Sequence, residues 1–142
     1  MSSRAIGDLS PAMQVICNKH LALCKRDTEL LRRGVEVIIT CTYRSNEEQA
    51  RLYSQGRDPN VPGPIVTRAK AGQSKHNTVN AQGKPAAEAY DLAPLVSGKI
   101  MWDDHAAWAI IGAHGKTAGA KWYGEPGAPF REMPHFELMK GN

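Results

Sequence analysis

The chain has few cysteines, no long apolar run, and no repeat, heptad or low-complexity tract. No window approaches the roughly 18 apolar residues of a membrane span, so we expect no membrane insertion. The first residues lack the positive region and apolar run of a secretory signal, which predicts a protein made and kept in the cytoplasm. We expect no nucleic-acid partner, because no helix-turn-helix, aromatic platform or long basic run is present.

Three cysteines, Cys17, Cys24 and Cys41, form no C-x-x-C pair, and their number is odd. Each lies in a stretch that is typical of a helix or strand in the core. This usage favours a reducing compartment, in which free cysteines act as small buried hydrophobic residues. We therefore expect packing roles for them rather than zinc or redox roles.

The length of 142 residues, with 42% hydrophobic residues, is enough for one ordinary core. We expect a single domain over residues 1–142 and a monomer. The formal charge of +4 suits an acidic polymer such as nucleic acid, anionic lipid or bacterial cell wall, without choosing among them.

Capping residues and apolar periodicity predict an α+β fold, with a small antiparallel sheet that carries the site and helices packed on its other side. We expect helices over 10–33, 45–56 and 103–118, and strands over 35–43, 121–123 and 135–138. The capping box at Ser45 places Arg44 at a strand-to-helix junction. Residues 57–73 are rich in Pro and Gly and predict an ordered loop that could wall a cleft.

The five histidines separate into two groups. His20, His105 and His114 have no partner motif, and we expect surface or packing roles for them, as we do for most lone histidines. His76 and His135 each lie in a polar cluster. These two are the candidate metal ligands.

Two histidines and an aspartate, His76, Asp91 and His135, supply the three protein ligands of a catalytic zinc, whose fourth position is left to water. Extended segments could bring the three donors together. Pro134 predicts a turn that brings the Glu132 carboxylate over the metal, where it would take a proton from the zinc-bound water.

Arg44, at a rigid strand end, is suited to neutralise the charge that develops on the carbonyl oxygen during hydrolysis. Ser74 could contact substrate or orient a ligand. Among the aromatic residues, Trp108 is expected in the core, whereas Trp122 and Tyr123 could line the substrate groove.

Several sequence blocks follow one another in a specific order along most of the chain: Ile39–Ala50, Tyr53–Arg57, Ser74–Asn77, Ala89–Asp91 and Met133–Leu138. In this order they resemble the bacterial and phage zinc peptidases that include L-alanyl-D-glutamate endopeptidase endolysins and D-alanyl-D-alanine carboxypeptidases. The resemblance implies that His76, Asp91 and His135 hold Zn²⁺. It also implies that Glu132 is the general base and that Arg44 stabilises the transition state.

The chain departs from the family pattern between the first histidine and the aspartate. Family members have a compact Ser-x-His-x-x-Gly-x-Ala-x-Asp block, whereas Asp91 here follows His76 by 15 positions. Residues 77–88 are expected to form a polar hairpin extension that leaves both ends free to meet at the metal. If the insertion displaces Asp91, Glu88 or His105 becomes the candidate ligand.

Three functions remain open. The first is a phage-type endolysin that cuts the L-Ala–D-Glu bond of the peptidoglycan stem peptide, after a membrane pore releases it from the host cytoplasm to the cell wall. The second is a D-alanyl-D-alanine carboxypeptidase with the same zinc chemistry. The third is a non-catalytic cell-wall binding module or a small nucleic-acid binder. Glu132 argues against a dead site, and we favour the first function.

Overall fold

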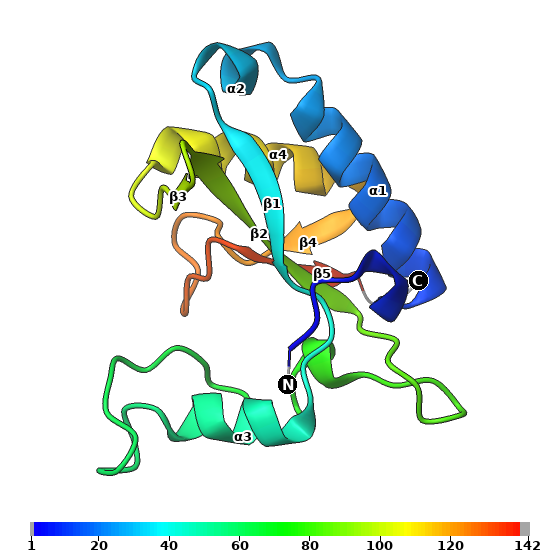
Figure 1. The fold of residues 1–142 in the computed structure, drawn as a ribbon, viewed down its shortest axis with the longest axis vertical. Coiled ribbons are helices and arrows are strands. Elements are labelled where there is room, and N and C mark those ends of the chain that lie inside the picture. Colours follow the sequence, from blue (N-terminus) through cyan, green and yellow to red (C-terminus); the bar gives the residue numbers. More distant parts are fainter. Residues whose placement is uncertain (1, 140–142) are drawn as a thin grey trace.

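A five-stranded antiparallel sheet lies in front of two long helices, and a shorter helix with long loops lies beyond one end of the sheet (Figure 1). The computed structural model describes residues 2–139. The predicted α+β class is confirmed. The elements in these residues are η1 (Ile6–Asp8), α1 (Pro11–Lys25), α2 (Thr28–Arg32), β1 (Glu36–Cys41), α3 (Asn46–Ser54), η2 (Lys75–Asn77), β2 (Ala89–Val96), β3 (Lys99–Ile100), α4 (His105–Ala118), β4 (Ala120–Trp122) and β5 (His135–Leu138).

The helix predicted over 10–33 is two helices. The Ser10 hydroxyl accepts from the Met13 amide, so α1 begins as expected, but the Asp27 carboxylate accepts from the Leu30 amide and caps a second helix, α2. This new start changes the helical phase. Leu31, which continues the apolar spacing of Met13, Cys17 and Cys24 and would lie on the buried face of one unbroken helix, is 63% exposed, and Leu30 is buried in its place.

The strand order is β1-β2-β5-β4, and β3 pairs with the far end of β2. In the central pair, Tyr90 lies opposite Phe136 and Asp91 lies opposite His135. Opposed residues of an antiparallel pair share a face, and successive residues alternate between faces. Tyr90 and Phe136 therefore point to the helices, while Asp91 and His135 point to the other face of the sheet.

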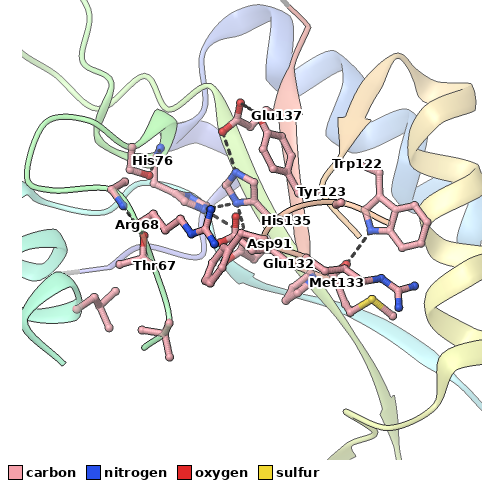
Figure 2. Close-up of a pocket in the computed structure, with 18 of the residues that line it drawn as sticks. Thr67, Arg68, His76, Asp91, Trp122, Tyr123, Glu132, Met133, His135 and Glu137 are labelled. Carbon is pink, nitrogen blue, oxygen red and sulfur yellow. Dashed lines mark hydrogen bonds and ion pairs between the residues drawn. The ribbon is translucent and has the colours of Figure 1, made fainter. Parts of the chain in front are cut away.

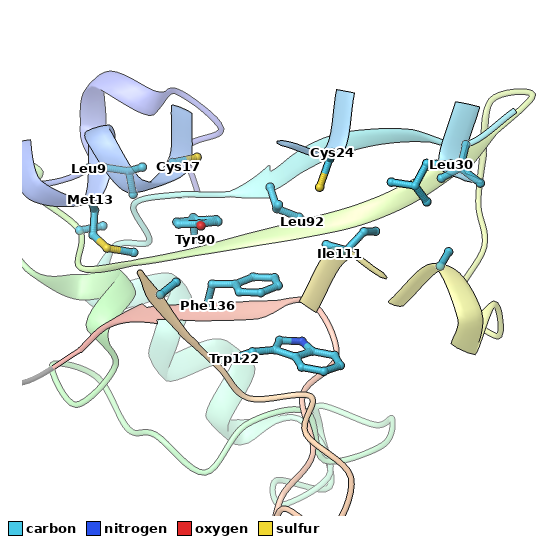
Figure 3. Close-up of a cluster of buried hydrophobic side chains, with 14 residues drawn as sticks. Leu9, Met13, Cys17, Cys24, Leu30, Tyr90, Leu92, Ile111, Trp122 and Phe136 are labelled. Atoms are coloured by element: carbon cyan, nitrogen blue, oxygen red, sulfur yellow. The ribbon is translucent and has the colours of Figure 1, made fainter. Parts of the chain in front are cut away.

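The core fills the space between this sheet and helices α1 and α4 (Figure 3). His20 is fully buried there: its Nε2 donates to the Ile111 carbonyl at 2.8 Å, and its Nδ1 accepts from the Tyr90 hydroxyl at 2.7 Å. Gly115 lets α4 approach closely, because a Cβ at this position would collide with the Phe136 ring. The predicted packing role of His20 is thus a buried, hydrogen-bonded one, and Trp108 is buried as expected.

The segments between β1 and β2 hold α3, η2 and a hairpin. The Ser45 hydroxyl accepts from the Glu48 amide, as the capping box predicts, and begins α3. Residues 77–88 form the expected hairpin, held by the Val79–Pro85 bridge. Over residues 2–139, we find no helix with the length and apolar character that crossing a membrane requires.

Candidate metal centre

Asp91 lies at the centre of a row of side chains that crosses three strands. It is opposite Cys41 on β1 and opposite His135 on β5. An irregularity in β1 between Ile39 and Cys41 shifts the register, as β-bulges often do beside functional sites. The strand register alone therefore brings one predicted ligand, Asp91, beside another, His135.

His76 reaches the same place from a 3-10 turn rather than from a strand, so the predicted extended conformation at this segment is wrong. The Ser74 hydroxyl accepts from the His76 amide at 3.1 Å, and the Asn77 side chain completes a capping box. The His76 carbonyl accepts from the Arg44 amide at 2.8 Å, which ties the turn to the end of β1. Ser74 thus caps the turn that carries a candidate ligand, and it also borders the cavity, so both of its predicted roles stay predictions.

The three predicted ligands place their donor atoms against one another (Figure 2). Asp91 Oδ1 lies 3.1 Å from His76 Nε2 and 3.1 Å from His135 Nδ1, and the two ring nitrogens are 3.2 Å apart. Donors bound tetrahedrally at about 2.0–2.1 Å from a zinc ion stand roughly 3.3–3.4 Å from one another. The observed triangle is thus close to the size that such an ion requires.

Neighbouring groups fix which nitrogen each imidazole presents. His76 Nδ1 lies 2.7 Å from the Thr42 carbonyl, which can only accept, so Nδ1 carries a proton and Nε2 faces the triangle. His135 Nε2 lies 3.0 Å from the Glu137 carboxylate, which leaves Nδ1 for the triangle. Partners of this kind orient metal-ligating histidines and raise their basicity. The residues present fit a metal ion.

The pKa values of the three groups indicate the charge that the site requires. Burial opposes ionisation of Asp91, but the two facing imidazoles hold the pKa of its carboxyl well below the usual range. Burial lowers the pKa of His76, yet the Asp91 carboxylate outweighs it and raises the pKa to about 10. For His135, hydrogen bonds to Asp91 and Glu137 likewise overcome burial and raise the pKa to about 9. Asp91 thus attracts positive charge at the position that a divalent cation would take.

Cys41 adds a donor that the sequence had assigned to packing. It forms a second candidate metal-binding group with His76 and Asp91, whose ligand atoms all lie within 4.8 Å of one another. Its Sγ lies 3.7 Å from His76 Nδ1, the nitrogen that already donates to Thr42. We favour the triangle with His135, because Nε2 is the nitrogen of His76 that is free to bind an ion.

Glu132 and Arg44 border the same cavity of about 1180 Å³. The predicted turn before β5 is present, and the His135 amide donates to the Glu132 carbonyl. Burial is the main cause that raises the pKa of Glu132, as suits a general base. Arg44 Nη2 lies 3.8 Å from Asp91, and Arg44 Nε is the buried side-chain donor that has no partner within the described part of the chain.

The two aromatic residues predicted for the groove lie differently. Tyr123 lies edge-on to the His135 ring and donates to Glu137 at 2.7 Å. Trp122 points the other way: its indole is 7% exposed, stacks with Phe136 in the core and donates to the Met133 carbonyl. Trp122 nevertheless borders the cavity, so its predicted contact with substrate stays a prediction beside its packing role in the core.

Neither alternative ligand is close to the triangle. Glu88 pairs with Lys75 at 3.6 Å, and His105 is exposed at the start of α4 on the helical side. His114, for which a surface or packing role was expected, pairs with Asp27 at 2.7 Å. The insertion after His76 therefore leaves Asp91 in place.

Comparisons with known proteins give one relationship in sequence and one in fold. The chain is 34% identical over 116 residues to the peptidoglycan L-alanyl-D-glutamate endopeptidase CwlK of Bacillus subtilis (strain 168), in an alignment that covers 75% of this chain and 63% of CwlK. The chain thus spans less than two thirds of the length of that relative. The crystal structure of the Serratia marcescens L-Ala D-Glu endopeptidase ChiX has a similar fold, with a TM-score of 0.57, 16% identity, and coverage of 98% of this chain and 89% of ChiX. No family model matches the chain.

Proposed function

We propose that this chain is a peptidoglycan hydrolase. The premise is that it is related in sequence to a peptidoglycan L-alanyl-D-glutamate endopeptidase and shares the fold of another. The bond that it cuts is the L-Ala–D-Glu bond of the stem peptide, and its cofactor is Zn²⁺. The observation that carries this proposal is the triangle of His76, Asp91 and His135 donor atoms beside Glu132 in one cavity.

The donor set favours zinc over harder cations. Two imidazoles with one carboxylate are ligands typical of zinc, whereas magnesium and calcium prefer oxygen ligands. A zinc ion held by these three residues supplies a Lewis acid and lowers the pKa of a water molecule to near neutrality.

The chain's own side chains supply the remaining chemistry. The Glu132 carboxylate accepts the proton of the attacking water and later passes it to the leaving amine, a role that its raised pKa suits. Arg44 lies in the cavity wall, and its buried Nε–H has no partner among residues 2–139. This group can meet the negative charge that develops on the carbonyl oxygen. Gln49 accepts from Arg44 Nη1 at 3.0 Å and keeps the guanidinium in place.

The bond specificity is tested by incubating the zinc-loaded protein with purified peptidoglycan of the diaminopimelate type and identifying the fragments by mass spectrometry. A new D-Glu amino terminus is expected. Release of terminal D-Ala would establish a carboxypeptidase instead, and an intact wall would contradict the hydrolase proposal. The His135→Ala variant is the control for a contaminating activity.

We further propose that the protein acts as a phage-type lysis enzyme, made in the cytoplasm and released through a membrane pore. Two observations support this: the net charge of +4 suits the anionic cell wall, and Cys17, Cys24 and Cys41 are free and buried. Cells that express the chain alone should keep growing, and co-expression with a pore-forming protein should lyse them. Survival of the co-expressing cells, while the purified protein still degrades isolated wall, would contradict the lysis role alone.

A further inference from the structure

A single arginine extends into the cavity from the loop between α3 and η2, on the wall that carries no candidate metal ligand. Arg68 is exposed, and its guanidinium lies 4.7 Å from the centre of the Phe130 ring. Phe130 belongs to the segment between β4 and β5, so the contact joins the two loops that border the cavity. Figure 2 shows the Arg68 side chain directed from the loop toward Asp91.

The backbone on both sides of Arg68 is fixed. The Ala69 carbonyl accepts from the side chain of fully buried Gln49 at 2.7 Å, and the Thr67 carbonyl accepts from Arg57 at 3.0 Å. Gln49 also holds Arg44, so one amide side chain anchors the Arg44 guanidinium and the backbone beside Arg68. Arg68 is thus preorganised, which lowers the entropy cost of binding a ligand through it.

No carboxylate among residues 2–139 forms an ion pair with Arg68. The two other arginines of the cavity have nearer partners: Arg44 faces Asp91 at 3.8 Å, and Arg131 donates to the Gly124 carbonyl at 2.7 Å. Lys121, also in the cavity wall, lies over the Tyr123 ring at 4.9 Å. A planar guanidinium matches a carboxylate in shape and charge, and it gains most from a carboxylate that water does not fully solvate. Arg68 therefore has the features of an unoccupied carboxylate-binding group.

The substrate of the proposed reaction brings such a group to the reacting bond. D-Glu in the stem peptide continues the chain through its γ-carboxyl, so its free α-carboxylate is one carbon from the scissile nitrogen. Asp91, Glu132 and Glu137 also border the cavity and would repel this anion. A cation on the opposite wall would attract the α-carboxylate away from these acidic groups.

We propose that Arg68 binds the α-carboxylate of the residue on the leaving side of the scissile bond and thereby selects acidic stem peptides. This inference rests on the proposed peptidase function. When no substrate is bound, the Phe130 ring holds the guanidinium extended through a cation–π contact. A carboxylate that binds the guanidinium does not disrupt this contact.

The test uses two synthetic stem peptides that differ only in the D-Glu α-group, one with the free acid and one with the amide. The values of kcat and KM are measured for the wild type, Arg68→Gln, Arg68→Lys and Lys70→Gln. Lys70→Gln is the matched control, because it removes the same charge from the same loop at a residue outside the cavity. Dissociation constants of both peptides in the Glu132→Gln background give a readout that does not depend on turnover.

We expect the kcat/KM of the wild type to be about tenfold higher for the acid peptide than for the amide, mainly through a lower KM. A charge-assisted hydrogen bond changes an affinity by about this factor. Arg68→Gln should lose the preference, because only the binding of the acid peptide becomes weaker. Arg68→Lys should keep part of the preference, and Lys70→Gln should keep all of it. A wild type that cleaves both peptides equally, or an Arg68→Gln variant that still prefers the acid, would overturn the role of Arg68 while the peptidase function stands. Failure to cleave or bind either peptide would overturn both proposals.

Discussion

The His135 imidazole and the Glu137 carboxylate, two residues apart on β5, are joined by a 3.0 Å hydrogen bond from Nε2 to Oε1. Both side chains lie on the same face of the sheet because strand residues alternate with a period of two. Tyr123 donates to the other carboxylate oxygen at 2.7 Å and holds Glu137 in place. The bond leaves His135 Nδ1 to face Asp91, so Glu137 determines which nitrogen can bind an ion.

Replacing Glu137 with alanine should therefore weaken metal binding without removing a ligand. Outer-sphere carboxylates of this kind contribute about 10- to 100-fold in metal affinity, and we expect a loss in that range. Competition with a chromophoric chelator measures it. Glu125→Ala, which removes a half-buried carboxylate that borders the cavity and pairs with Lys116, is the control. Equal zinc affinities for the two variants would show that Glu137 does not orient His135.

Two variants distinguish the candidate donor sets around His76 and Asp91. Cys41→Ser should retain one equivalent of zinc, because His76 Nδ1, the nitrogen beside the thiol, is already bonded to Thr42. His135→Ala should lose the ion, since it removes one of three converging donors. Zinc content is read by elemental analysis after dialysis. Loss of zinc in Cys41→Ser with zinc retained in His135→Ala would assign the site to Cys41. Stoichiometric zinc retained in Asp91→Ala would contradict both assignments.

Glu132→Gln should keep zinc and lose most of the hydrolytic activity. The amide fills the same space but cannot accept the proton of the attacking water, and general-base catalysis contributes about 10²- to 10⁴-fold. Initial rates on purified peptidoglycan, divided by the zinc-loaded fraction, give the comparison. If the variant were fully active, another group would have to be the base.

The sequence predicts the residues of the site better than it predicts the helices, turns and strand pairings that bring them together. Strand periodicity sets His135 and Glu137 on one face of β5, and the pairing of β2 with β5 then brings Asp91 opposite His135. Trp122 and Tyr123 both border the cavity. The register of β4 with β5 sets Trp122 opposite Phe136, so its indole also packs in the core, which a strand read alone does not reveal.

Other features depend on long-range pairing that periodicity does not contain. The register shift in β1 places Cys41 opposite Asp91, and a strand read alone gives no signal of it. The division of the first helix is different, because Asp27 is a good N-cap residue visible in the sequence. The apolar spacing continues past Asp27 as far as Leu31, which is why periodicity predicts a single helix over 10–33.

The buried imidazole of His20 should make stability depend on pH. Burial lowers its pKa from the usual 6.5 to about 4, so the unfolded chain binds one more proton than the folded chain between these two values. Stability from the neutral imidazole is complete above pH 6.5 and is lost as the pH falls toward 4. The loss amounts to about 3 kcal/mol at about 1.4 kcal/mol per pH unit.

The measurement is the free energy of unfolding by urea at several pH values between 4 and 6.5, with metal removed, for the wild type and for His20→Gln. The glutamine can still donate to the Ile111 carbonyl and accept from the Tyr90 hydroxyl, the two bonds that His20 makes, but it does not titrate. Its stability should therefore fall less steeply with acid, by about 1.4 kcal/mol per pH unit, whatever its absolute stability. His105→Gln, at an exposed position, should have the wild-type slope. Equal slopes for the wild type and His20→Gln would mean that His20 is not held neutral by the core, since every other titrating group is common to both proteins.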